Sequence, residues 1–170
     1  MSHLKDRLTW HDGGIFDADR RYLMLRADVL MGVVRQLPAE LQATVLAAMA
    51  DSVAANGGKS AQAYFEAIGR DPATLLQVMV ESSADLGWGQ WQFVGLNHAP
   101  LDPGHMATGL ALQVQHSPFA AGHGPASQPV CTPIVGMLRA VGSLLLGQAT
   151  VAETHCAAQG HAHCRFEIRA

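Results

Sequence analysis

The chain has 170 residues and a formal net charge of −3, with 49% apolar and only 15% charged residues. Its length suits one domain with a sizeable core. The low charge fraction, against about 25% in typical domains, leaves neutral surface for oligomerisation or a docking partner. The negative balance and the lack of a basic run argue against a nucleic-acid surface. No apolar stretch approaches the length of about 18 residues that a membrane-spanning helix needs.

An N-terminal arm is expected over residues 1–26. Asp12, Gly13 and Gly14 are typical turn residues, and residues 21–26 after them alternate as a short strand does. Such a strand either joins its own sheet or exchanges with a second subunit. Together with the neutral surface, this arm leads us to expect a homodimer.

Residues 27–85 are predicted to be a helical half. Apolar residues recur at helical spacing in four segments. One is capped by Asp28, one starts at Pro38, a short one surrounds Tyr64, and the last is capped by Asp71. A Gly57-Gly58 pair is expected to end the second of these helices. This half contains no catalytic constellation.

Strands are predicted in the second half, from about residue 86. Residues 88–95 and 106–114 alternate in the way strands do, the latter with one large apolar face. A helix is predicted from Pro129 to Leu146, followed by a hairpin of two strands at about 150–155 and 162–169.

These elements predict an α+β fold in a single domain over residues 1–170. An antiparallel sheet in residues 86–170 is expected to pack against the N-terminal helical half and the one late helix. A metal ion is expected to clip the C-terminal hairpin, for the following reasons.

All three cysteines lie between Cys131 and Cys164, and a carboxylate, Glu153, precedes Cys156 by three residues. Three cysteines cannot all pair within one chain. The first residues lack the apolar core and cleavage site of a secretion signal, so we expect a cytoplasmic protein with reduced thiols. Zinc takes thiolates and carboxylates in a tetrahedral shell, which is structural when protein fills it. Cys131, Glu153, Cys156 and Cys164 are therefore predicted to bind one structural Zn²⁺.

Spacing alone leaves alternatives to this ligand set. Glu153 and Cys156 would lie on opposite faces of a regular strand, so they reach one ion only if the chain bulges or turns by Cys156. His155, His161 or His163 could replace Glu153, because imidazole is the commoner zinc ligand. Three ordinary buried cysteines are the alternative without a metal.

A wider set of residues resembles a known family. The set comprises His116, Ser117, Pro118, Phe119, Pro129, Val130, Cys131, Gly136, Gly142, Gly147, Val151, Glu153, Cys156, Gly160, Cys164, Phe166 and Ile168, with Gly87, Trp88 and Gly89 upstream. Over residues 114–168 the chain resembles the 4-vinyl-reductase domain family. That family includes bacteriochlorophyll 4-vinyl reductases and the sensory domains of phenol-responsive transcription activators, and it is distantly similar to vesicle-tethering subunits.

The resemblance implies an antiparallel sheet packed against helices, with a ligand cavity between them. In the sensory members, a Cys followed by Glu-x-x-Cys and a last Cys eight positions on holds a structural zinc. Cys131, Glu153, Cys156 and Cys164 match that pattern. The ligand implied is an apolar or aromatic molecule. A tetrapyrrole intermediate of bacteriochlorophyll synthesis is favoured if the reductases are the nearer relatives.

Aromatic residues near the strands are the candidates for lining a pocket, since small-molecule pockets are mostly apolar with a few polar groups. For each of them plain core packing is the alternative. The candidates are Trp88, Trp91, Phe93, His116 and Phe119.

An enzymatic role has less support in the residues. The chain has no Gly-x-Gly-x-x-Gly fingerprint for a nicotinamide or flavin cofactor, and reduction of a vinyl group needs such a hydride source. A zinc shell filled by protein also has no open position for catalysis. We therefore expect a carrier or accessory binding protein. The alternatives are a 4-vinyl reductase, and an aromatic sensor or protein-interaction module.

Overall fold

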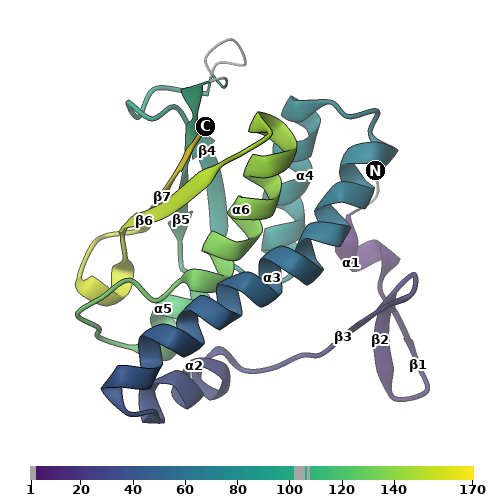
Figure 1. The fold of residues 1–170 in the computed structure, drawn as a ribbon. Coiled ribbons are helices and arrows are strands. Elements are labelled where there is room, and N and C mark those ends of the chain that lie inside the picture. The colour runs from purple at the N-terminus through teal and green to yellow at the C-terminus, as the bar shows by residue number, and fades with distance from the viewer. Residues whose placement is uncertain (1–2, 102–105, 107) are drawn as a thin grey trace.

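The computed structural model describes residues 3–101, 106 and 108–170. Helices and two antiparallel sheets make up the fold, which confirms the predicted α+β class (Figure 1). The elements are α1 (Leu4–Arg7), β1 (Thr9–His11), β2 (Gly14–Asp17), β3 (Arg20–Tyr22), α2 (Ala27–Gln36), α3 (Ala39–Ala67), α4 (Pro72–Asp85), β4 (Gln90–Val94), β5 (Leu110–Gln115), α5 (Pro118–His123), α6 (Thr132–Leu146), β6 (Thr150–His155), the 3₁₀ turn η2 (Ala157–Gln159) and β7 (Cys164–Arg169).

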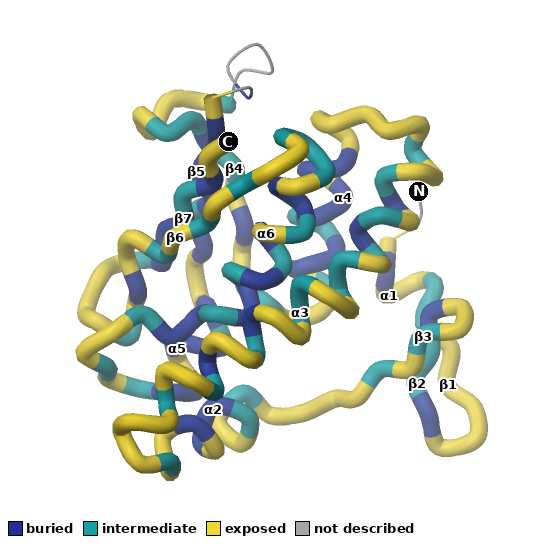
Figure 2. Tube along the Cα trace, in the orientation of Figure 1, coloured by how far each residue is buried: buried dark blue, intermediate teal, exposed yellow. Residues whose placement is uncertain are grey.

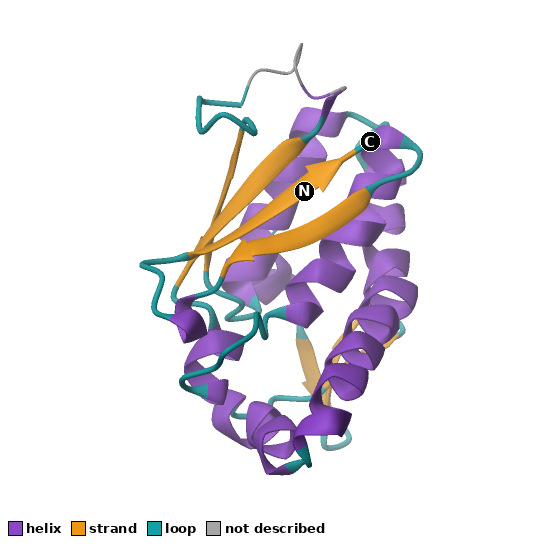
Figure 3. Cartoon of the chain, turned by 60° about the vertical axis from the view of Figure 1, so that its left-hand side comes forward, coloured by secondary structure: helices purple, strands orange, loops and turns teal. Residues whose placement is uncertain are grey.

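The larger sheet carries the main core. Its strand order is β4-β5-β7-β6, with every neighbouring pair antiparallel. Helices α3, α4 and α6 lie on one side of it (Figure 3). Leu112 of β5, Phe166 of β7 and Leu138 of α6 are completely buried between these layers. Apolar side chains from both halves of the chain therefore form one core.

Helix α3 is longer than the sequence predicts. It continues through Gly57 and Gly58 to Ala67, so the expected stop and the separate short helix are both wrong. A Cβ at Gly57 would lie 2.9 Å from Met137 Cε, and one at Gly58 would lie 3.0 Å from Ala140 Cβ. The two glycines allow α3 to approach α6 closely, and this packing keeps the segment helical.

The N-terminal arm is a small sheet of its own with the order β1-β2-β3. Asp12 and Gly13 have φ of 51° and 70° and form the tight turn between β1 and β2. The predicted strand over 21–26 is confirmed only as far as Tyr22, where pairing ends. Residues 23–26 then run exposed to α2 (Figure 2). We call residues 23–26 the strap.

The second half follows the prediction with shifted boundaries. The strand expected over 106–114 begins at Leu110, and residue 107 of that prediction lies outside the described residues. Short helix α5 follows β5, with Ser117 accepting a hydrogen bond from the Ala120 N–H as its cap. The expected β6–β7 hairpin is present. No helix within the described residues is both long and apolar enough to cross a membrane.

Candidate functional site

The end of β6, the turn η2 and the start of α6 bring the three cysteines together. Cys131 directly precedes α6, Cys156 lies between β6 and η2, and Cys164 is the first residue of β7. Gly160, with φ of 92°, ends η2 and lets the chain turn back towards β7. All three cysteine side chains are completely buried.

The spacing of the sulfurs suits a single tetrahedral ion. Cys131 Sγ lies 3.9 Å from Cys156 Sγ and 3.6 Å from Cys164 Sγ. One ligand atom from each of these residues and from Glu153 lies within 4.8 Å of all the others. Two sulfurs bound to one zinc at about 2.3 Å in tetrahedral geometry would be about 3.8 Å apart. The four residues can therefore hold a metal ion in their observed positions.

Glu153 completes this cluster through an irregularity in β6. The register of β6 against β7 shifts between Glu153 and His155, which is the bulge that a common ion requires. Glu153 Oε2 accepts a hydrogen bond from the Cys131 N–H at 3.0 Å. The other oxygen, Oε1, is buried with no hydrogen-bond partner among the described residues. A buried oxygen of this kind is expected to have a partner, and a cation in the cluster would supply it.

Neighbouring groups support two of the sulfurs. Ser117 Oγ lies 3.2 Å from Cys131 Sγ, and the Ala157 N–H donates to Cys164 Sγ at 3.3 Å. Hydrogen bonds of this kind orient metal ligands and stabilise thiolates. The surroundings of the cluster are thus prepared for negatively charged sulfur.

The pKa values of the acidic groups in the cluster also favour a bound cation. Burial raises the pKa of the Glu153 carboxyl to about 8, and the charge of Cys156 and a hydrogen bond with Cys156 act in the same direction. Hydrogen bonds with Cys156 and Cys164, together with burial, raise the pKa of the Cys131 thiol, and hydrogen bonds with Cys131 and Cys156 lower that of Cys164. Several acids in one dry site cannot all ionise unless a positive charge joins them.

The three histidines considered as alternative ligands lie outside the four-residue cluster. The His155 ring is exposed and lies against the His161 ring, with 4.6 Å between centroids. His163 is half-buried beside Cys164 in the chain. The carboxylate of Glu153 therefore occupies the fourth position of the cluster.

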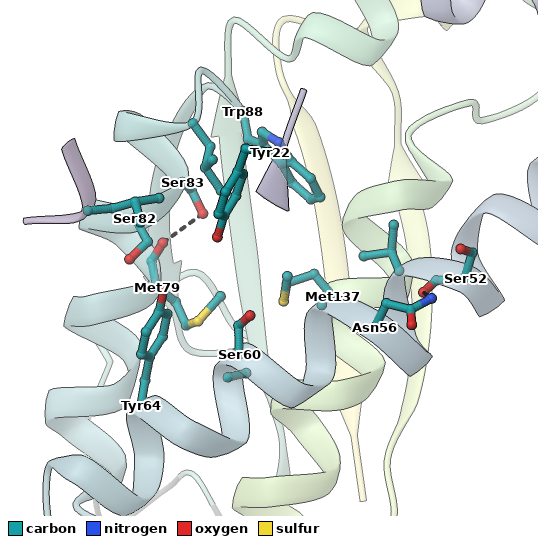
Figure 4. Close-up of a pocket in the computed structure, with 15 residues that line it drawn as sticks. Tyr22, Ser52, Asn56, Ser60, Tyr64, Met79, Ser82, Ser83, Trp88 and Met137 are labelled. Atoms are coloured by element: carbon teal, nitrogen blue, oxygen red, sulfur yellow. Dashed lines mark hydrogen bonds between the residues drawn. The ribbon is translucent and has the colours of Figure 1, made fainter. Parts of the chain in front are cut away.

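A cavity of about 250 Å³ lies away from this cluster, between the helices and the N-terminal sheet (Figure 4). Helices α3, α4 and α6 supply most of its wall, and Leu4 of α1 and Tyr22 of β3 close it from the N-terminal side. Its lining consists of Leu4, Tyr22, Ser52, Val53, Asn56, Gly57, Ser60, Ala61, Tyr64, Met79, Ser82, Ser83, Leu86, Trp88 and Met137. An apolar interior with several hydroxyl groups is typical of a small-molecule site.

The comparison with protein families finds a match in the part of the chain that contains the cysteine cluster. Residues 110–170 match the model of the 4-vinyl-reductase domain. Over these residues the chain is similar to that domain family. The match confirms the resemblance seen in the sequence, and it contains Cys131, Glu153, Cys156 and Cys164. No curated protein sequence matches the chain.

Solved structures share the fold well beyond the 4-vinyl-reductase domain. The phenol-responsive sensory domain of the transcription activator PoxR, solved with phenol, has a TM-score of 0.77 at 20% identity, covering 98% of this chain and 86% of that one. A vinyl-4-reductase family protein from Methanocaldococcus jannaschii has a TM-score of 0.53 at 12% identity, covering 87% and 96%. A trafficking protein particle complex subunit 3 from Naegleria fowleri, covalently bound to palmitic acid, has a TM-score of 0.54 at 11% identity, covering 84% of this chain and 93% of that one.

The aromatic pocket candidates fall on both sides of residue 110, where the family match begins. Trp88, before the match, lines the cavity. Behind it, Trp91 is buried, with its ring centroid 6.5 Å from that of Trp88 and 6.4 Å from that of Phe93. Within the matched residues, Phe119 meets Trp88 edge-on at 5.2 Å, whereas His116 is exposed on a surface hollow beside α5 and η2. Trp88 is thus the candidate in direct contact with the cavity, and Phe119 and Trp91 support it.

Cavity residues outside the aromatic set gave no sequence signal. Ser60, Ser82 and Ser83 are ordinary helix residues, and Met137 is the one lining residue within the matched range 110–170. A small residue on a helix indicates a cavity only when the positions of the neighbouring helices are known. The matched range therefore contains the cysteine cluster, whereas the preceding part of the chain builds most of the cavity.

Proposed function

We propose that this protein binds a compact apolar or aromatic molecule in the cavity between α3, α4 and α6, and a structural zinc ion at the cysteine cluster. The observation that carries the proposal is the cavity itself, an apolar space with Tyr22, Ser60 and Ser82 among its few polar groups. Such hydroxyls can donate to or accept from a hydroxyl or carbonyl on a ligand. A ring with one polar substituent suits this lining.

The PoxR sensory domain supports this choice of ligand class. It shares the fold along nearly the whole of this chain, and its structure was solved with phenol. A phenol-like molecule has the size and the single polar group that the cavity favours. We propose either storage and delivery of such a molecule or its detection on behalf of a separate partner.

Size favours a small ligand over a tetrapyrrole. Sites for drug-sized ligands have volumes of about 300–1,000 Å³, and this cavity, at about 250 Å³, lies just below that range. A tetrapyrrole macrocycle, the ligand favoured by the bacteriochlorophyll relatives, would require the helices or the N-terminal sheet to move apart. We therefore place it second.

Titration with phenol, 2-naphthol and a chlorophyllide-type pigment tests the ligand class. We expect calorimetric binding of one of the two small aromatics, and loss of that binding in Ser60→Phe, which fills the cavity from α3. Ala63→Phe is the matched control, because Ala63 lies on the same helix, is exposed and does not line the cavity. Binding of the pigment alone would replace the proposed ligand class. Turnover of a divinyl pigment with NADPH would establish a reductase instead.

The zinc ion is proposed to be architectural. Three thiolates and one carboxylate fill a tetrahedral shell, so the ion would join the β6–β7 hairpin to the start of α6. Thiolates stay reduced in the cytoplasm, which is where we expect the protein to act.

A homodimer is proposed through the strap and α2. Leu23 and Met24 are 82% and 79% exposed, and Leu25, Val29 and Val33 beside them in the chain are also exposed. Soluble monomers rarely leave a contiguous apolar surface of this kind open. Light scattering is expected to give about 36 kDa, twice the 18.0 kDa of one chain. Met24→Glu should reduce the mass to that of the monomer, and an 18 kDa wild-type protein would contradict the dimer.

A further inference from the structure

Residues 4–22 are joined to α3 by hydrogen bonds between a charged cluster of their own and the Tyr64 hydroxyl. Asp17 of β2 is buried and accepts hydrogen bonds from Arg7 of α1 at 3.2 Å and from Arg20 of β3 at 3.0 Å. Tyr64 of α3 donates to the same carboxylate at 3.3 Å and accepts from Arg7 at 3.0 Å. We call Arg7, Asp17, Arg20 and Tyr64 the latch.

Tyr64 joins the latch to the cavity. Its ring lines the cavity, and the guanidinium groups of Arg7 and Arg20 lie 5.2 Å and 5.8 Å from the ring centroid. Tyr22, the last paired residue of β3, also lines the cavity. A ligand in the cavity would therefore contact the wall that the latch holds in place.

The other attachments of residues 4–22 lie at α1, where the Lys5 N–H donates to Asp85 Oδ2 at the end of α4 at 3.2 Å and Leu4 is buried. Strand β1 is exposed along its whole length. Within the latch, Arg20 Nε is buried with no hydrogen-bond partner among the described residues. Segments with few apolar contacts and incompletely satisfied polar groups open locally at low cost, without unfolding the core.

We propose that residues 4–22 form a lid on the cavity, held shut by the latch, and that ligand binding and lid closure stabilise each other. This inference rests on the proposed binding function. Coupling of this kind is reciprocal, so a ligand must protect the lid from opening to the extent that the closed lid retains the ligand. The lid also gives a sensor its moving part, because its position would report occupancy of the cavity.

Asp17→Asn tests the lid from a residue that does not line the cavity. The neutral amide is a weaker acceptor for the Tyr64 hydroxyl of α3, so the lid should open more often, and the release rate of 2-naphthol in stopped-flow fluorescence should rise roughly tenfold. Asp12→Asn is the matched control. It makes the same charge change in the same sheet, but Asp12 is exposed and pairs only with His11 among the described ion pairs, so its release rate should equal that of the wild type.

Hydrogen exchange on the wild-type protein provides a second test that needs no variant to fold. Saturation with 2-naphthol should slow exchange of residues 9–22 several-fold while exchange of β1–β3 in the free protein is fast. Unchanged exchange on binding, or equal release rates in Asp17→Asn and the wild type, would overturn the lid while leaving the binding function in place. Absence of 2-naphthol binding to the wild type, with phenol also inactive, would overturn both.

Discussion

The cysteine cluster and the cavity are built in opposite ways. The cluster gathers four side chains of distinctive chemistry from a short part of the chain, residues 131–164, and buries its cysteines completely. The cavity collects ordinary residues from position 4 to position 137, and some of them, such as Ser52 and Asn56, are exposed. One region is closed by groups that could hold a metal ion, whereas the other is closed by packing and by the latch.

This difference predicts which part of the molecule is rigid and which part moves when a ligand binds. A metal ion at the cluster would tie α6, β6 and β7 together with a large binding free energy, so the C-terminal hairpin should then behave as a rigid unit. The cavity wall depends on helix contacts and on a few hydrogen bonds, each of modest net strength. Ligand-dependent movement is therefore expected at the N-terminal side.

Removal of the metal should produce the largest effect. We expect one zinc per chain by metal analysis, and Cys156→Ser should lose it together with about 5 kcal/mol or more of unfolding free energy, because binding energy in such sites is folding energy. Urea unfolding measures the loss. His155→Ala is the control: His155 is exposed and outside the cluster, so it should keep its zinc. Zinc-free purified protein of unchanged stability would remove the contrast between the two regions.

Replacement of the carboxylate alone should have the next largest effect. Glu153→Gln keeps the size of the side chain but removes its charge, and we expect a cost of about 2–4 kcal/mol and weaker zinc retention in competition with a chelator. Matched His161→Ala and His163→Ala variants distinguish the ligands. Should either histidine variant lose zinc while Glu153→Gln retains it, the fourth ligand would be an imidazole.

The interface between α3 and α6 connects the two regions and should be less sensitive. A Cβ added at Gly136 would collide with the backbone of Ala50 in α3, so Gly136→Ala should cost about 1–3 kcal/mol by overpacking and distort the cavity. At Gly32 of helix α2, by contrast, an added Cβ meets nothing within 4 Å. Gly32→Ala should therefore be neutral or stabilise by up to about 1 kcal/mol. Thermal melts of both variants, with their zinc content, check this prediction.

The smallest expected effect is a pH dependence of the latch. Burial opposes ionisation of Asp17, but hydrogen bonds and charges from Arg7 and Arg20 outweigh it and lower the pKa of that carboxyl. The folded state then binds fewer protons than the unfolded chain, so this stabilisation is present above about pH 4 and is lost as pH falls through the folded-state pKa. The stability difference between wild type and Asp17→Asn should shrink over that range. A constant difference would contradict the role of the charge.

The sequence by itself determined the fold class and which four residues form the cysteine cluster. Three cysteines in a chain without a disulfide pattern, with Glu153 at a fixed spacing, indicated one ion, and the need for a bulge before Cys156 followed from strand geometry. Asp71 and Pro72 likewise marked the start of α4. These features can be predicted from the sequence because each depends on a few side chains with special bonding or backbone preferences that lie close together in the chain.

Only the tertiary structure decided the course of α3, the position of the cavity and the latch. Gly57 and Gly58 look like a helix stop in isolation, but contacts with Met137 and Ala140 far along the chain make them a packing surface. Asp17 and Tyr64 are 47 residues apart, and neither has a local pattern that points to the other. The same residue can end a helix or pack against one, and contacts with distant segments decide which of these structures forms. A cavity exists only where the side chains of such segments leave the space between them unfilled.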